Sequence, residues 1–328
     1  MKQVLISVLI PAYNASLFLK RCLDSIIFSY EKAPGDDIEV ICIDDGSKDD
    51  TWNLLQKYSQ RYTYIRVYHK ENGGVGSARN EALKYARGKY IGWVDSDDYV
   101  EEDWYRSIAE NLKEHHPDCL LIDYNIKHGD EVEHKNIRLP EHITVQQFIY
   151  ELSYERELKS YLWTEFIRAD LWQGVRFPSL SMQEDVTVLT ELIVKYVNIY
   201  HVRQNLYCYV MNDKSITHNA TCDMIWSNIH VLKKRYEKFK QLGFSYRLNS
   251  YVSELVTYWY NPGALKDKKI FERRKQIKME VQYLWGNILI DPSISRKTKL
   301  KLFCIHWGIS RPLFFLLMIK WIKTFKNR

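Results

Sequence analysis

Four short apolar runs alternate with segments of helical periodicity over the first hundred residues, and this alternation restricts the fold more than any other feature. The runs are Val4–Ala12, Ile38–Ile43, Ile65–Tyr68 and Tyr90–Val94. The segments between them carry apolar residues three or four positions apart, as Leu19, Leu23 and Ile26 do in the first. Strands that alternate with helices predict an α/β fold with a mostly parallel sheet and helices on its faces.

Polar residues follow each of the four runs. They are Tyr13 and Asn14 after the first, Asp44 to Ser47 after the second, Asn72 to Gly74 after the third, and Asp95 to Asp98 after the fourth. In α/β sheets, ligands bind beyond the carboxyl ends of the strands. We therefore expect these four loops to converge on one crevice.

The last of these loops concentrates three carboxylates, those of Asp95, Asp97 and Asp98. Like charges raise one another's pKa unless a metal ion or another positive group neutralises them. Mg²⁺ and Mn²⁺ are typically held by one or two carboxylates together with water and substrate phosphate oxygens. The alternative is a solvated acidic turn that caps the next helix. Convergence of the loops favours a metal and a diphosphate ligand.

The glycine-rich stretch Asn72–Asn80 invites comparison with the dinucleotide-binding fingerprint, but it differs in two respects. Arg79 occupies the third glycine position, and the loop follows the third strand rather than the first. An NAD-linked dehydrogenase is therefore disfavoured. Arg79 either offers positive charge to a phosphate or uracil-bearing ligand, or it is exposed or paired with a neighbouring acid.

Asp44 and Asp45 also allow two interpretations. A carboxylate at the mouth of the crevice would accept a hydrogen bond from a base N–H or a ribose hydroxyl, with Tyr13 stacked on the base. Alternatively, the two acids simply form a turn with Gly46.

Together these motifs resemble glycosyltransferase family 2. The matching segments are Ser7–Asn14, Cys22–Ile26, Ile43–Ser47, Asn72–Gly74 with Ala78–Asn80, Asp95–Asp98 and Gln183–Asp185. The resemblance implies the GT-A fold and the transfer of a sugar from a nucleotide donor with inversion at the anomeric carbon.

The resemblance also implies residue roles. The nucleotide-sugar would be bound by Pro11, Tyr13, Asn14, Asp44, Asp45, Gly74, Arg79, Asp95 and Ser96. Asp97, in an Asp-x-Asp motif, would bind the metal, which is Mn²⁺ or Mg²⁺. Asp185 would be the catalytic base and Glu184 the second candidate for that role. The alternative for this acidic pair is a helix N-terminus that complements the helix dipole.

The alternation stops after about residue 215, and 224–242, 246–260 and 271–290 have the pattern of helices. We expect a GT-A catalytic domain over 1–215, with a nucleotide-sugar half over 1–100 and an acceptor half over 101–215. A helical region over 216–328 would follow. Its end combines the apolar run Leu313–Ile319 with cations and is too short to span a bilayer. Residues 311–328 either form an amphipathic helix on an anionic membrane or pack on the catalytic domain.

Other features bound the function class. Six scattered cysteines without metal-ligand spacing suggest reduced thiols in the cytoplasm. Val4–Ile10 is a better buried strand than a signal peptide. The formal net charge of +6 gathers in the tail rather than on a broad basic face, so nucleic acid is not expected as a partner.

Together with the resemblance, these observations favour a cytoplasmic, membrane-peripheral enzyme that would transfer one sugar from a UDP-sugar to a glycan or lipid-linked acceptor in surface polysaccharide synthesis. The motif of processive synthases, Gln-x-x-Arg-Trp, is absent. The alternative is a non-catalytic nucleotide-sugar or glycan-binding module on the same scaffold. Carboxylates at both Asp97 and Asp185 argue against it.

Overall fold

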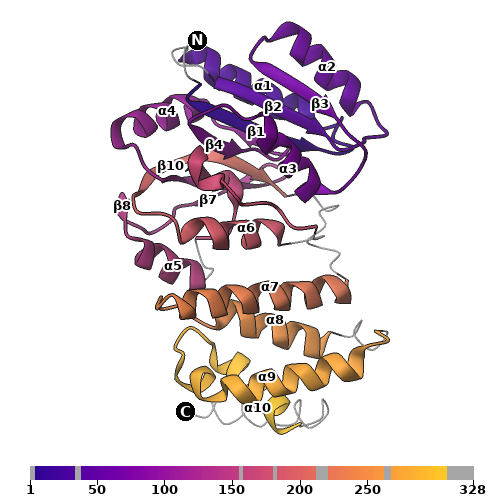
Figure 1. The fold of residues 1–328 in the computed structure, drawn as a ribbon, viewed down its shortest axis with the longest axis vertical. Helices are drawn as coiled ribbons and strands as arrows, with labels where there is room; N and C mark the ends of the chain where they lie inside the picture. Colours follow the sequence, from indigo (N-terminus) through magenta and orange to yellow (C-terminus); the bar gives the residue numbers. More distant parts are fainter. Residues whose placement is uncertain are drawn as a thin grey trace. The chain divides into compact units, whose positions relative to one another are not determined.

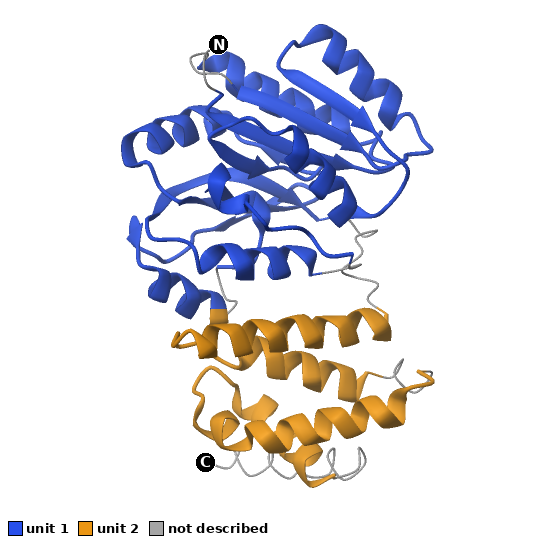
Figure 2. Ribbon diagram, viewed as in Figure 1, with its two compact units in different colours: residues 1–152, 156–218 blue, residues 153–155, 219–328 orange. Residues whose placement is uncertain are grey.

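A computed structural model describes residues 4–33, 38–154, 158–179, 183–211, 221–261 and 267–308. The chain forms two compact units: residues 1–152 with 156–218, and residues 153–155 with 219–328 (Figure 2). The boundary expected near residue 216 lies outside the described residues, so its position stays a prediction.

Unit 1 is built on one mixed sheet (Figure 1). Its strands are β1 (Ile6–Ala12), β2 (Ile38–Asp44), β3 (Ile65–His69), β4 (Tyr90–Trp93), β5 (Tyr99–Val100), β6 (Cys119–His128), β7 (Glu131–Lys135), β8 (His142–Ile143), β9 (Glu165–Arg168) and β10 (Ile199–Val210). The strand order is β3-β2-β1-β4-β9-β6-β10-β5, with β7 beside β6 and β8 beside β10. The first four strands in this order are parallel, whereas β9 is antiparallel to both of its neighbours.

The helices of this unit are α1 (Leu19–Lys32), α2 (Thr51–Arg61), α3 (Val75–Tyr85), α4 (Trp104–His115), α5 (Val145–Tyr154) and α6 (Glu184–Ile193). Two short 3₁₀ turns, Leu162–Thr164 and Ala169–Trp172, flank β9. Every residue of β1 and β2 is buried, as expected for parallel strands covered on both faces. The predicted α/β fold is confirmed.

The register of the parallel strands brings their carboxyl ends together. Ala12 is paired with Asp44, and Asp44 is paired with His69. On the other side of β1, Val94 N–H donates to the carbonyl of Leu9 at 3.1 Å, so the chain after β4 leaves the same edge. The loops that carry the polar residues therefore start next to one another.

Unit 2 consists of α7 (Cys222–Gln241), α8 (Asn249–Tyr260), α9 (Ile270–Ile290) and α10 (Arg296–Trp307). The first three correspond to the expected helices, whereas α10 was not expected. Ser295 caps α10, because its Oγ accepts from Thr298 N–H at 3.1 Å. In the described part of the chain, no helix has both the length and the apolar character that crossing a bilayer requires. Residues 311–328 lie outside the described residues.

Candidate active site

An open cleft of about 570 Å³ lies at the carboxyl ends of β1, β2 and β4. It is lined by Pro11, Ala12, Tyr13, Asn14, Ala15, Phe18, Asp45, Asn72, Gly74, Val75, Ala78, Arg79, Asp95, Ser96 and Asp97. This volume lies in the range of small-molecule and cofactor sites. All four predicted loops contribute to it, so the crevice inferred from the sequence exists.

The two neighbouring acids after β2 have different surroundings. Asp45 lines the cleft, and its carboxylate pairs with Lys70 Nζ at 2.7 Å. Asp44 is fully buried and does not line the cleft. It lies 2.6 Å from His69 Nδ1 and accepts from Ser47 N–H at 3.2 Å. Asp44 thus ties β2 to the end of β3, and only Asp45 lies directly at the cleft.

The loop before α3 is held by Asp45. The N–H of Gly74 donates to Asp45 Oδ2 at 2.7 Å, and Gly73 N–H contacts both carboxylate oxygens. Gly74 has φ of +84°, a conformation in which a Cβ would be strained. It leads directly into α3, whose first residue, Val75, also lines the cleft. The positive end of this helix therefore borders the space where a phosphate would lie.

The loop after β1 is tied to the loop after β2. Asn14 N–H donates to Ser47 Oγ at 2.8 Å, and Asn14 Oδ1 accepts from Lys48 N–H at 2.8 Å. Asn14 has a positive φ of 49°, which is uncommon outside glycine. The Tyr13 side chain remains half exposed at the cleft, where its ring is available for stacking.

The acidic loop after β4 divides its carboxylates between two roles. Asp95 and Asp97 line the cleft, but Asp98 is fully buried. Asp98 accepts from Tyr207 Oη at 2.7 Å and from Val210 N–H at 2.8 Å. Burial, with Asp95 and Asp97 adding to it, raises the pKa of Asp98 well above its usual range. Two carboxylates rather than three therefore face the cleft.

The surroundings of Asp97 suit a hard divalent cation. Burial and the nearby Asp95 carboxylate raise the pKa of Asp97, so a cation there would relieve an electrostatic cost. Over the described ranges, no three His, Cys, Asp or Glu side chains come close enough to hold a metal together. The chain would thus supply one or two oxygen ligands and leave the rest to water and substrate phosphate, as is typical of Mg²⁺.

Arg79 of α3 bridges the acidic loop and α6. Its Nη1 lies 2.6 Å from Glu184 Oε1, and its Nη2 lies 3.3 Å from Asp95 Oδ1. The guanidinium is buried against the rings of Trp93 and Phe177. Burial alone would lower the pKa of Arg79, but Asp95 and Glu184 outweigh it and raise the pKa. Of the alternatives for Arg79, pairing with an acid is the one observed, and its side chain still lines the cleft.

The predicted base lies at the start of α6. Gln183, directly before the helix, has a positive φ of 65°, and Glu184 is held by Arg79. The half-buried Asp185 has no cationic partner among its described hydrogen bonds and accepts from Val186 N–H at 2.7 Å. Burial and the Glu184 charge raise the pKa of Asp185 to about 7, although Arg79 opposes this shift. A carboxylate with this pKa is suited to accept a proton at neutral pH.

Three further residues support the site and were missed from the sequence. Tyr207 Oη accepts from Asp95 N–H at 3.1 Å while it donates to Asp98. Arg21 donates to the carbonyl of Asp97. Asn80 forms two hydrogen bonds, of 2.8 and 2.9 Å, with the backbone of Phe177. Arg21 lies next to a matched motif segment and Asn80 lies within one, although no binding role was predicted for either, and no local pattern marks Tyr207.

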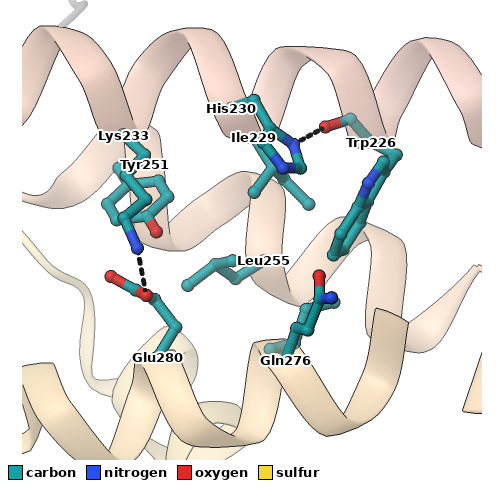
Figure 3. A pocket seen from close by; sticks show the side chains of 9 residues that line it. Trp226, Ile229, His230, Lys233, Tyr251, Leu255, Gln276 and Glu280 are labelled. Carbon is teal, nitrogen blue, oxygen red and sulfur yellow. Dashed lines mark hydrogen bonds and ion pairs between the residues drawn. The ribbon is translucent and has the colours of Figure 1, made fainter. Parts of the chain in front are cut away.

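A second cavity lies among α7, α8 and α9 in unit 2 (Figure 3). It measures about 70 Å³ and is lined by Trp226, Ile229, His230, Lys233, Tyr251, Leu255, Gln276, Ile277 and Glu280. Its two charged side chains, Lys233 and Glu280, pair with each other at 2.6 Å. The cavity is too small for a nucleotide-sugar. The cleft of unit 1 is therefore the candidate active site.

Residues 7–181, more than half of the chain, match the family model described as glycosyl transferase family 2. The chain therefore belongs to this family, and membership supports a glycosyltransferase enzyme over the alternative of a non-catalytic module.

Individual relatives agree with the family. The chain is 28% identical over 220 residues to EpsJ of Bacillus subtilis, an uncharacterised glycosyltransferase. The match covers 65% of this chain and 63% of EpsJ. It is 39% identical over 148 residues to a poly(ribitol-phosphate) beta-glucosyltransferase of Bacillus spizizenii, over 37% of this chain and 23% of that protein. The chain thus spans less than two thirds of the length of these relatives.

Among solved structures, the chain resembles residues 1–349 of TarS from S. aureus in complex with UDP-GlcNAc. The TM-score is 0.65 at 21% identity, and the match covers 92% of this chain and 87% of the TarS chain. At this identity, the likeness establishes the GT-A fold.

Proposed function

We propose that this glycosyltransferase transfers a single sugar from a UDP-sugar to a hydroxyl of a glycan or lipid-linked acceptor, with inversion at the anomeric carbon. The observation that carries the proposal is Asp185, a carboxylate beside Glu184 at the start of α6, whose pKa burial and the Glu184 charge raise to about 7. The UDP-GlcNAc complex of TarS, which has the same fold, supports the choice of a UDP-sugar.

The reaction follows from this arrangement. The donor diphosphate lies against the start of α3, and Tyr13 stacks on the base. Asp185 accepts the proton of the acceptor hydroxyl as that oxygen attacks the anomeric carbon. The bond from this carbon to the diphosphate oxygen breaks on the opposite face, and the nucleoside diphosphate leaves with the electron pair. Glu184, held by Arg79, positions Asp185 rather than replacing it.

A divalent cation, Mn²⁺ or Mg²⁺, would be held by Asp97 with Asp95 beside it. When bound, it supplies Lewis-acid stabilisation of the negative charge on the departing diphosphate. Arg21, which donates to the Asp97 carbonyl, and Tyr207, which holds Asp95 N–H, keep the acidic loop in place for this role.

The cellular setting is also part of the proposal. The names of relatives such as the poly(ribitol-phosphate) glucosyltransferase support a role in bacterial surface polysaccharide synthesis. We place the protein in the cytoplasm on the inner face of the membrane, with the basic segment 311–328 in contact with anionic lipid.

Release of nucleoside diphosphate from UDP-, GDP- and dTDP-sugars, with Mn²⁺, Mg²⁺ or a chelator, tests the proposal. We expect release from one UDP-sugar that needs metal and is lost in Asp97→Asn. Equal release in the presence of chelator would contradict the metal requirement. Release from a GDP- or dTDP-sugar alone would contradict the choice of uridine.

A further inference from the structure

Large exposed apolar side chains gather on two helices of unit 2. The described residues include thirteen such side chains, and seven lie on α9 and α10. They are Phe271, Met279, Tyr283, Leu289, Ile290, Phe303 and Trp307. Tyr283 and Ile290 are more than three quarters exposed, at 76% and 79%. A concentration of this kind on a folded surface marks an interaction site.

Five of these residues, Met279, Tyr283, Ile290, Phe303 and Trp307, form one surface, which we call the α9–α10 face. On α9, Met279, Tyr283 and Ile290 are four and seven residues apart and so share one side of the helix. The buried residues of α9 (Ile270, Arg273, Ile277, Val281, Leu284 and Ile288) occupy the opposite side. On α10, Phe303 and Trp307 are likewise four residues apart, away from the buried Leu302 and Ile305.

The two helices that carry these exposed stripes pack side by side. The ring of Trp285 on α9 contacts those of Phe303 and His306 on α10, with centroids 6.1 and 4.5 Å apart. At the other end of α10, Lys299 Nζ donates to the carbonyl of Leu289 at 2.7 Å. Figure 1 shows the two helices next to each other in unit 2.

Cations are frequent on the two helices that carry the α9–α10 face. The two helices carry eight Lys and Arg residues, but Arg273 is buried on the opposite side of α9 and paired with Asp223 and Asp267, which leaves seven against two Glu residues. One of the two, Glu280, is already paired with Lys233. The other, Glu272, is exposed in the first turn of α9. Exposed Lys275, Arg296 and Lys297 face solvent. The two helices therefore offer exposed apolar side chains together with exposed cations.

We propose that the α9–α10 face docks on an anionic lipid surface. Apolar and aromatic side chains with a Lys-rich surround are the features by which helices bind in the membrane interface, and anionic headgroups add attraction for each cation. A second copy of the chain fits poorly, because a symmetric interface would oppose the same cations.

The inference shares its partner with the proposed contact of 311–328 but rests on different residues. It is tested by sedimentation of the full chain with vesicles of phosphatidylcholine alone or with one quarter phosphatidylglycerol. Tyr283→Ser with Ile290→Ser removes two side chains of the face. Val132→Ser with Val197→Ser, which changes exposed apolar residues of unit 1, is the matched control. We expect the first pair to bind the anionic vesicles at least tenfold more weakly and the control to bind like the wild type.

A second pair, Lys275→Glu with Arg296→Glu, keeps every apolar residue and is expected to lose the preference for phosphatidylglycerol. Lys320→Glu with Lys323→Glu tests the segment 311–328 separately, and nucleoside diphosphate release from all variants tests the catalytic proposal. Unchanged vesicle binding in both α9–α10 pairs, with wild-type circular dichroism, would overturn the inference. A dimer in sedimentation equilibrium that dissociates in Tyr283→Ser with Ile290→Ser, without loss of vesicle binding, would assign the face to a second copy instead.

Discussion

Arg79 and Glu184, 105 positions apart in the sequence, form a buried ion pair with 2.6 Å between Nη1 and Oε1. The same guanidinium reaches Asp95, so one residue of α3 contacts both the acidic loop and the helix that carries Asp185. Glu184 is thereby occupied, and the neighbouring Asp185 is left as the carboxylate with a pKa near neutrality. This division of roles supports the assignment of Asp185 as the base.

The Arg79–Glu184 pair is expected to stabilise the fold cooperatively. Arg79→Met leaves Glu184 as a buried, unpaired carboxylate, which costs about 3–5 kcal/mol. Arg79→Met combined with Glu184→Met should cost clearly less than the sum of the single changes. Urea unfolding of the four proteins measures this coupling. The exposed pair Lys84–Glu81 serves as control, with an expected coupling within about 1 kcal/mol. Additive effects at Arg79 and Glu184 would contradict the structure.

Asp185→Asn is expected to remove transfer while preserving the donor site. An amide does not accept the acceptor proton, and general-base catalysis typically contributes about 10²–10⁴-fold in rate. Donor affinity should change little, because Asp185 does not line the cleft. Initial rates and calorimetric titration with the UDP-sugar identified in the release assay measure the two effects. Full activity in this variant would exclude Asp185 as the base.

The pKa of about 7 at Asp185 predicts a pH dependence of activity. The base must be deprotonated, so kcat/KM should fall about tenfold for each pH unit below the pKa and level off above it. Rate measurements from pH 5 to 9 reveal this profile. A profile that is flat between pH 6 and 8 would contradict the assignment.

The contribution of Asp185 to stability should fall as the pH rises, whereas the activity should rise. Burial raises the folded-state pKa of Asp185 above its ordinary value, so between about pH 4 and 7 the folded protein holds a proton that the unfolded chain has lost. The contribution of Asp185 to the free energy of unfolding therefore decreases as the pH rises through this window. Asp185→Asn should gain stability relative to the wild type from pH 4 to pH 7. Thermal unfolding of both proteins at matched pH values measures the difference.

Tyr207→Phe is expected to weaken the support of the acidic loop while it keeps the aromatic ring in place. The change deletes the hydroxyl that joins Asp95 N–H to Asp98, two hydrogen bonds of 3.1 and 2.7 Å. The stacking of this ring on Trp163, with centroids 4.4 Å apart, should remain. We expect a loss of about 1–3 kcal/mol in stability and weaker metal-dependent donor binding. Tyr283→Phe, at an exposed tyrosine, is the control. Wild-type donor affinity in Tyr207→Phe would show that the loop does not need this support.

The sequence was sufficient to predict the sheet edge and most of its loops, because parallel strands separated by helices leave their carboxyl ends at one edge. It was not sufficient to separate Asp44 from Asp45. Successive residues at a strand end point in different directions, so one of two adjacent acids lines the cleft while the other is buried beside His69. The three carboxylates after β4 were ambiguous for the same reason.

Local sequence patterns did not predict the contacts between distant segments. Tyr207 reaches Asp95 from β10, a strand whose pairing with β6 shifts register between Val202 and Tyr207. Such irregularities change which side chains face a given side of a sheet, and alternation in the sequence does not reveal them. By contrast, α10 had a recognisable start, because Ser295 is followed by Thr298, whose N–H it accepts.

The neighbours Arg79 and Asn80 on α3 connect the two sides of the site. Arg79 holds Glu184 and Asp95, and Asn80 grips the backbone of Phe177 ahead of α6. In the proposed mechanism, two adjacent residues of a single helical turn thus set the distance between the proton acceptor and the donor sugar, rather than the long chain between them. Changes in the segments that bind the acceptor would then leave this geometry intact, as long as the turn of α3 continued to hold both sides.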